Sequence, residues 1–127
     1  WGTGAPFREF LYVDDLAEAC IFVLENWYPA SQNFGNNKGN EELPWLNVGS
    51  QEEISIKSLA IKISKFLGFE GDIIWNKDQP DGTPRKKLDS SKINKLGWKS
   101  KTNLDDGIKK TIKNYKLLKS QNKLRLS

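Results

Sequence analysis

Trp1, Arg8 and the glycines between them form the first of three stretches whose residue types suit ligand binding. Glycines allow a backbone to approach a ligand closely. Trp1 offers an aromatic face to a sugar or a base, and Arg8 can hold a phosphate group through two parallel hydrogen bonds. The alternative is a surface turn in which Arg8 pairs with Glu9 or Asp14. The spacing alone favours neither interpretation.

The second stretch is the turn-rich segment 78–87, with the sequence DQPDGTPRKK. Its prolines and glycine predict a rigid loop. Asp81 can accept hydrogen bonds from the hydroxyl groups of a sugar or ribose, while Arg85 and Lys86 suit a diphosphate. Composition by itself favours an exposed basic loop without a ligand.

The third stretch is the pair Asp14 and Asp15, which raises the question of a metal site. Carboxylates at the start of a helix also cap it, and that explanation needs no ion. The chain has no His and a single Cys, so it predicts neither a structural zinc site nor an internal disulfide. Cys20 falls in an apolar helical stretch, and we predict that its side chain is buried and serves only for packing. We predict no metal ligands.

The sequence lacks the groups that an oxidoreductase with a nucleotide cofactor needs. No G-x-G-x-x-G motif follows a strand, and there is no His for acid–base chemistry. None of the three tyrosines has a lysine three residues after it. We therefore predict no catalytic and no cofactor-binding residue in this chain.

Short strands and helices alternate along the chain and would position these stretches. Aromatic and branched residues predict a strand over 7–13, and Asp14 and Asp15 then start a helix over 16–24 that is apolar on more than one side. In chain order, the remaining predictions are a polar loop over 29–42, a strand over 45–49, a helix from Ser55 stopped by Gly68, a strand over 72–75, a helix over 90–96 stopped by Gly97 and a helix from Asn103. This order predicts the α/β class.

The overall composition is that of a globular protein, with a formal net charge of +4. After Asp106 every charged residue is basic: Lys109, Lys110, Lys113, Lys116, Lys119, Lys123 and Arg125. Such a tail suits nucleic acid, but a solvated helix face explains it without a partner, and no aromatic platform accompanies the charges. No apolar run is long enough to span a membrane, and the single cysteine fits a cytoplasmic location.

Several segments resemble the extended short-chain dehydrogenase/reductase superfamily. The opening WGTGAPFREFLYVDDLAEA is similar to its sugar-nucleotide-binding segment, in which an arginine precedes an acidic–Phe pair and V-D-D starts a helix. LNVGS at 46–50 and IKSLA at 56–60 resemble the next strand and helix, and LDSSKINKLGWK resembles a late short helix. The resemblance implies a Rossmann-type α/β fold of which this chain is the carboxy-terminal, substrate-binding part.

The segment PDGTPRKKLD, residues 80–89, resembles the corresponding loop of the GDP-L-fucose synthase family. That resemblance implies an NADPH-dependent enzyme that epimerises C3 and C5 of GDP-4-keto-6-deoxy-D-mannose and then reduces C4, giving GDP-L-fucose. The family's catalytic residues and NADP-binding glycines would lie upstream of Trp1, and Cys20 does not match its catalytic cysteine. The chain starts at Trp1 and has no Met, so we expect it to be part of a longer protein.

The resemblance assigns five residues to the GDP-sugar. Trp1 and Arg8 match substrate-contacting residues of the family, and Asp81, Arg85 and Lys86 fall in the loop that covers the nucleotide sugar. All of 1–127 would form the sugar-nucleotide-binding part, 7–26 would pack against an upstream Rossmann domain, and 119–127 would be a frayed tail. The whole enzyme would be a cytoplasmic homodimer with no nucleic-acid or membrane partner. The alternatives are another nucleotide-sugar dehydratase or epimerase, or a basic nucleic-acid-binding module.

Overall fold

Three short strands and four helices make up the described part of the protein. A computed structural model describes residues 1–28 and 45–124. The elements in chain order are β1 (Phe7–Glu9), α1 (Val13–Asn26), β2 (Glu53–Ser55), α2 (Ile56–Leu67), β3 (Arg85–Lys86), α3 (Ser91–Leu96) and α4 (Leu104–Ser120). The predicted α/β class is therefore confirmed. The loop predicted over 29–42 lies outside the described residues.

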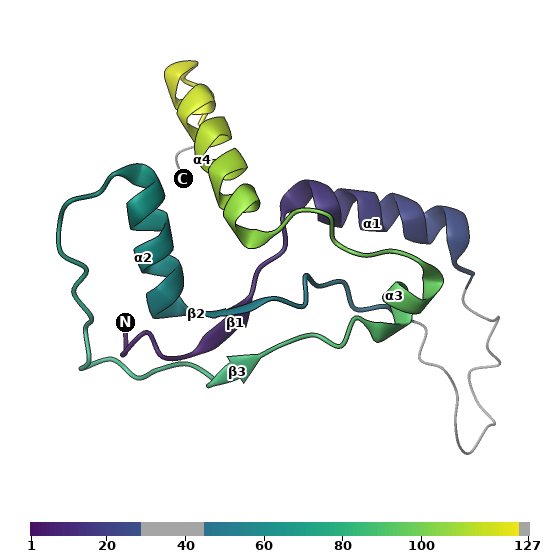
Figure 1. The fold of residues 1–127 in the computed structure, drawn as a ribbon, viewed down its shortest axis with the longest axis horizontal. Helices are drawn as coiled ribbons and strands as arrows, with labels where there is room; N and C mark the ends of the chain where they lie inside the picture. Colours follow the sequence, from purple (N-terminus) through teal and green to yellow (C-terminus); the bar gives the residue numbers. More distant parts are fainter. Residues whose placement is uncertain (29–44, 125–127) are drawn as a thin grey trace.

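The strands form one small mixed sheet along the middle of an elongated molecule, as Figure 1 shows. The sheet order is β2-β1-β3, with β1 antiparallel to β2 and parallel to β3. Phe7 is the register partner of both Ser55 and Arg85, and Arg8 is the partner of Lys86. Because β1 and β3 are parallel, the chain between them must cross over, and it does so through α1, β2 and α2.

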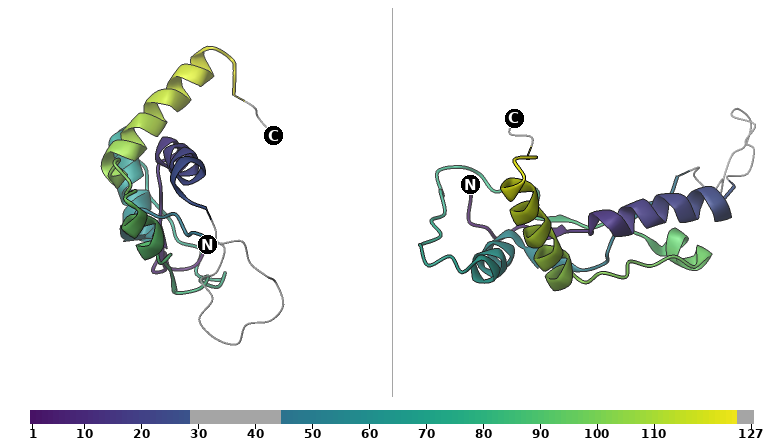
Figure 2. Two further views of the ribbon diagram at one scale, coloured as in Figure 1. Left: turned by 90° about the vertical axis from the view of Figure 1, so that its right-hand side faces the viewer. Right: turned by 90° about the horizontal axis from the view of Figure 1, so that it is seen from above.

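Helices lie at both ends of this sheet. α2 lies at one end and α3 at the other, while α1 extends alongside α3 (Figure 1). Figure 2 shows α4 leaning away from the strands, so that its far end projects from the body of the molecule. The first part of α4 contacts α2, where Lys109 lies over the ring of Phe66 at 5.2 Å. No helix among the described residues is long and apolar enough to cross a membrane.

The predicted boundaries of α2, α3 and the start of α4 agree with the structure, whereas the helix predicted over 16–24 extends over Val13–Asn26. Ser55 Oγ accepts a hydrogen bond from Ser58 N at the start of α2, and Asn103 Oδ1 accepts one from Asp106 N at the start of α4. Gly68 and Gly97 end α2 and α3 with φ angles of +66° and +114°, a conformation that favours glycine. α4 continues to Ser120, and the frayed tail over 119–127 stays a prediction, because residues 125–127 lie outside the described part.

The strand predictions were partly wrong. β1 ends at Glu9 and α1 begins at Val13, so the apolar segment 10–12 is a connection and not a strand. Residues 45–49 and 72–75 form no strand, whereas the predicted loop 78–87 contains β3. Apolar content at these places reflects packing without strand pairing.

Two packing contacts explain why the segments 45–49 and 72–75 are apolar without forming strands. Leu46 and Val48 pack against the buried core formed by Ala19, Ile93 and Trp98. The ring of Trp75 covers Gly4 so closely that a Cβ at Gly4 would lie 2.6 Å from it. In both segments the chain runs beside the sheet without adding to it, and its large side chains fill space.

Helix α1 turns one side to the core and another to solvent. Ala19 is fully buried against Ile93, while the apolar side chains of Val13, Leu16, Ile21 and Leu24 are exposed, Leu24 by 78%. Cys20 is also exposed, so the prediction that it is buried was wrong. The cause is helical geometry, since the residue after Ala19 points about 100° away from the core.

Asp15 is buried but does not cap its own helix, contrary to the sequence prediction. Its carboxylate accepts hydrogen bonds from Lys101 N at 3.0 Å, from Thr102 N at 2.8 Å and from Thr102 Oγ1 at 2.9 Å. Burial by itself would raise the pKa of Asp15, but the hydrogen bonds from Thr102 and Lys101 outweigh it, so the pKa lies below its usual value. Asp15 therefore fastens α1 to the connection between α3 and α4.

Candidate functional site

The two loop stretches singled out in the sequence lie against each other. The Asp81 carboxylate accepts hydrogen bonds from Thr3 N at 2.8 Å and from Thr3 Oγ1 at 2.6 Å. Phe7 N donates to Pro84 O at 2.9 Å, which continues the contact into β1. Gly2 has a φ of +67°, and a Cβ there would overlap Asp81 Oδ1. Residues nearly eighty positions apart thus form a single loop pair.

Asp81 has a structural partner that the sequence did not suggest. The side-chain hydrogen bond from Thr3, followed by the backbone N–H of Thr3, lowers the pKa of Asp81. Its carboxylate thereby fastens the turn that carries Trp1, whose side chain is 85% exposed. Each carboxylate oxygen has a second lone pair, so contact with a sugar hydroxyl stays a prediction.

Arg8 is anchored to backbone at one end of its guanidinium group. Nη1 donates to Phe7 O at 2.6 Å and to Thr83 O at 2.8 Å. Within the described part of the chain, neither Glu9 nor Asp14 forms an ion pair with Arg8, so the structure does not adopt that alternative. The anchored end fixes the direction of the side chain, and Nε and Nη2 are the atoms that can meet a ligand.

Lys86 lies beside Arg8. The two residues are register partners across the parallel β1–β3 pair, and partners in a ladder project to the same face of a sheet. Both border a hollow of about 440 Å³, together with Glu9, Leu11, Val48, Gly49, Lys87 and Leu88. This hollow combines three cationic residues and one carboxylate with apolar side chains, and ligand sites often have such a composition.

Arg85 lies on the opposite face and is already paired. Its Nε donates to Glu53 Oε1 at 2.8 Å and to Oε2 at 3.0 Å, and its Nη2 also bonds Glu53. The Glu53 side chain is only 11% exposed, and the hydrogen bond from Arg85 lowers the pKa of Glu53 and raises that of Arg85. The two cations predicted as one pair, Arg85 and Lys86, therefore point to different sides of the sheet.

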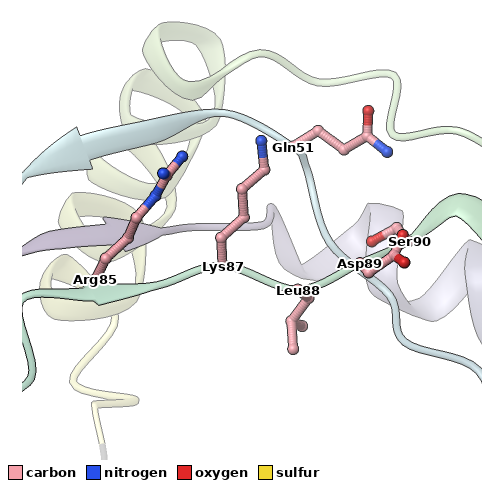
Figure 3. A pocket seen from close by; sticks show the side chains of 6 residues that line it. All are labelled: Gln51, Arg85, Lys87, Leu88, Asp89 and Ser90. Atoms are coloured by element: carbon pink, nitrogen blue, oxygen red, sulfur yellow. The ribbon is translucent and has the colours of Figure 1, made fainter.

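Figure 3 shows the second hollow, on the side of Arg85. Arg85 and Lys87 extend toward β2, whereas Leu88 points the other way. Gln51, Asp89 and Ser90 complete this hollow of about 600 Å³. Lys87 Nζ lies 4.0 Å from Glu53 Oε2, so both basic side chains here face the same carboxylate.

Glu9 is the functional candidate that sequence reasoning missed, since it was considered only as a partner for Arg8. Its Oε1 accepts a hydrogen bond from Gln51 N, and its Oε2 accepts one from Leu88 N at 3.0 Å. The signal in the sequence was the acidic residue directly after the arginine, in the stretch that resembles the sugar-nucleotide-binding segment.

Other candidate chemistry has no supporting geometry. Tyr115 has a lysine four residues after it, Lys119. Both lie on α4 beyond its contact with α2, and Tyr115 is 49% exposed. Among residues 1–28 and 45–124, no group of three or more His, Cys, Asp or Glu side chains is placed to hold a metal ion.

Comparisons with known proteins agree with the sequence resemblance. The sequence profile of the NAD dependent epimerase/dehydratase family matches residues 1–34. The chain is 45% identical over 115 residues to a probable GDP-L-fucose synthase 1 from Oryza sativa subsp. japonica, covering 91% of this chain and 31% of the relative. It is 36% identical over 129 residues to the GDP-L-fucose synthase from Escherichia coli K12, covering 98% of this chain and 37% of the relative.

Solved structures give the same answer for the fold. A GDP-6-OMe-4-keto-L-xylo-heptose reductase from Campylobacter jejuni matches with a TM-score of 0.78 and 36% identity, over 92% of this chain and 33% of that one. A GDP-mannoheptose C4 reductase from Campylobacter jejuni with NADP bound matches with a TM-score of 0.72 and 36% identity, over 91% of this chain and 33% of that one.

The described fold is similar to about a third of each of these reductases, which confirms the predicted resemblance to Rossmann-type enzymes of the extended short-chain dehydrogenase/reductase superfamily. Within that superfamily the predicted resemblance to GDP-L-fucose synthase is confirmed by the relatives in sequence. The chain spans about a third of the length of the curated relatives it matches.

Proposed function

We propose that this chain is the GDP-sugar-binding part of an NADPH-dependent enzyme that converts GDP-4-keto-6-deoxy-D-mannose to GDP-L-fucose. The single observation that carries the proposal is the register pairing of Arg8 with Lys86 at the rim of one hollow. Relatives named GDP-L-fucose synthase and neighbours named GDP-sugar reductases support the choice of substrate and cofactor.

The diphosphate of the substrate is the group that fits this pair of cations. Two adjacent phosphates carry negative charge that Nε and Nη2 of Arg8 and the Lys86 ammonium can neutralise from one side. The Arg85–Glu53 ion pair supports Lys86 over Arg85 as the second cation. The contacts of Arg85 with Glu53 belong to the opposite face of the sheet.

Trp1 and Asp81 would bind the rest of the nucleotide sugar. The exposed Trp1 ring lies on the turn that Asp81 fastens through Thr3, so the two residues reach the same ligand from one loop pair. An aromatic face suits a sugar or a guanine, and a carboxylate with remaining lone pairs suits hydroxyl groups. Their roles are thereby coupled, since loss of Asp81 also loosens the turn that carries Trp1.

NADPH does not fit the described residues. β1 leads into α1 through Phe10, Leu11 and Tyr12, without the glycines that let a dinucleotide pyrophosphate approach a helix start. NADPH would supply the hydride for reduction at C4 and would be held by chain outside these residues. Epimerisation at C3 and C5 also needs acid–base groups, which we place in that same part.

The exposed apolar side of α1 supports packing of residues 7–26 against a cofactor domain of the whole enzyme. Val13, Leu16 and Leu24 are all substantially exposed. An enzyme that buries them would protect the α1 backbone amides from hydrogen exchange, and rapid exchange throughout α1 in the whole enzyme would contradict this packing. We also place the enzyme in the cytoplasm as a homodimer that does not bind nucleic acid.

The nucleotide preference tests the proposed function. Calorimetric titration of the whole enzyme with GDP, UDP and dTDP is expected to give tightest binding for GDP. Preference for uridine or thymidine diphosphate would instead favour another nucleotide-sugar dehydratase or epimerase. Binding of none of the three nucleotides would remove the proposal. Because phosphate recognition is electrostatic, the GDP affinity should also fall as salt is raised.

A further inference from the structure

The Glu9 carboxylate accepts hydrogen bonds from backbone groups of the two segments that flank β1 in the sheet. Gln51 precedes β2 and Leu88 follows β3, and the sheet order β2-β1-β3 puts these segments on opposite sides of β1. Oε1 accepts from Gln51 N and Oε2 accepts from Leu88 N at 3.0 Å. One side chain therefore ties together three segments of the chain.

These two hydrogen bonds begin where the backbone pairing stops. The β1–β2 ladder ends at the pair Glu9 and Glu53, and the β1–β3 ladder ends at the pair Arg8 and Lys86. Beyond these pairs, the N–H groups of Gln51 and Leu88 meet a carboxylate oxygen where a longer β1 would supply carbonyls. The Glu9 side chain thus extends both ladders past the end of a three-residue strand.

The backbone around Glu9 is shaped to permit this arrangement. Gln51 has a φ of +65°, an uncommon conformation for a residue other than glycine. A Cβ on Gly49 would lie 2.5 Å from Glu9 Oε1, so a larger residue there would displace the carboxylate from its present position. Two unusual local features therefore accompany the same two hydrogen bonds, which is typical of a constrained functional position.

Before Lys86, the strand is held by its pairing with β1 and by the bond from Phe7 N to Pro84 O, and after Lys86 it is held by Glu9. β3 consists of Arg85 and Lys86 alone, and the bond from Leu88 to Glu9 is the next restraint along that strand. Arg8 is fixed by its bond to Thr83 O, which does not involve Glu9. The spacing between the two cations consequently depends on how firmly Glu9 holds the segment 86–88.

We propose that Glu9 is a positioning residue, which holds Lys86 at a set distance from Arg8 so that both cations meet one diphosphate. The proposal rests on the proposed function, because it assumes that this pair of cations binds GDP. Charge-assisted hydrogen bonds from two backbone amides make a carboxylate suited to this task. An amide side chain is not, because its nitrogen cannot accept the second N–H.

Glu9→Gln in the whole enzyme tests the proposal with GDP as the probe. The expected result is a rise of about tenfold in the GDP dissociation constant, because Lys86 would no longer be held at its distance from Arg8. The NADPH dissociation constant should stay within about twofold. Hydrogen exchange at the Gln51 and Leu88 amides should become faster in the variant, and that readout does not depend on GDP.

Glu18→Gln is the matched control. It makes the same change of atoms and charge at the ion pair with Lys101, 2.6 Å long, on α1. GDP affinity and exchange at Gln51 and Leu88 should be unchanged in that variant. If Glu9→Gln does not fold, Glu9→Asp decides, because it keeps the charge but is too short to reach both amides and should weaken GDP binding in the same way.

A double-mutant cycle with Lys86→Ala separates positioning from a general structural role. If Glu9 acts through Lys86, the effect of Glu9→Gln on GDP affinity largely disappears once Lys86 is absent. Unchanged GDP affinity in Glu9→Gln, or an equal loss with and without Lys86, would overturn the proposal. A wild-type enzyme that binds no GDP would instead overturn the proposed function itself, so the two failures are distinguishable.

Discussion

At the scale of single residues, Arg8 performs two tasks. Its Nη1 fastens the loop at Thr83, and its other nitrogens point the cationic group toward the ligand that we propose. A residue that only bound phosphate would tolerate lysine in part, whereas the bond to a carbonyl also needs the shape of the guanidinium group. The two tasks can be separated by comparing variants.

In the whole enzyme, Arg8→Ala is expected to raise the KM for the GDP-sugar by about tenfold or more, because charge-assisted hydrogen bonds are worth about 1.5–3 kcal/mol each. Arg8→Lys should fall between the alanine variant and the wild type, and the KM for NADPH should hardly change. Steady-state kinetics with both substrates measures this. A substrate KM that stays at the wild-type value in Arg8→Ala would exclude Arg8 from the site.

Asp15 gives a prediction about stability. Asp15→Asn places an NH₂ group or a single oxygen against donors from Lys101 and Thr102, and we expect a loss of about 1–3 kcal/mol in the free energy of unfolding. Urea unfolding of both proteins at neutral pH measures it. Asp14→Asn, at the exposed neighbouring position, is the control and should change little.

The pH dependence of the same comparison follows from the direction of the shift. The pKa of Asp15 is lower in the folded than in the unfolded protein. Its contribution is therefore fully present above the unfolded-state pKa, about 3.9, and is lost as the pH falls through the folded-state pKa. The stability difference between wild type and Asp15→Asn should shrink in that acidic range. A difference that grows on acidification would contradict the hydrogen-bond assignment.

At the scale of elements, β3 separates two cations that are adjacent in sequence. Lys86→Ala is expected to weaken GDP binding by about tenfold with little change in the melting temperature. Arg85→Ala should leave the GDP dissociation constant within about twofold, because Arg85 faces Glu53 on the other side of the sheet. Titration calorimetry on both variants shows which face of the sheet binds GDP. A larger loss in Arg85→Ala would reverse our assignment.

Helices were predictable from the sequence and strands only in part, for a physical reason. The caps at Ser55, Gly68, Gly97 and Asn103 act within one turn of their own helices, so a short stretch of sequence contains the whole interaction. Strand formation depends on a partner far along the chain. The basic segment at 85–86 becomes β3 only because β1 lies beside it, which no property of the segment itself indicates.

In the candidate site too, residue types were predictable from the sequence, whereas their distant partners were not. The residue types of Trp1, Arg8 and Asp81 pointed to ligand binding, and the structure brings their two stretches together. The partners of Asp81 and Arg8 could not be predicted, because Thr3 and Thr83 have no distinguishing local pattern. Glu9 was overlooked for that reason, since its importance depends on backbone donors more than forty residues away.

At the scale of the whole molecule, the described residues carry the binding surface that we propose and form no cofactor cradle. The purified 127-residue chain is expected not to oxidise NADPH in the presence of a GDP-4-keto sugar, because the described residues form no cofactor cradle and the sequence has no His. Absorbance at the NADPH band measures this. Any turnover above that of a heat-treated sample would show that hydride transfer needs nothing beyond this chain.

The bond between Glu9 and Leu88 joins residues 79 positions apart, and this separation has a consequence for synthesis on the ribosome. At about 5–20 residues per second, roughly 4–16 s pass between the emergence of the two partners. During that interval Arg8 and Glu9 have no native neighbours on the β3 side. Their charges keep the nascent segment hydrated beside the apolar residues that follow, and the sheet closes only after the second loop has left the exit tunnel.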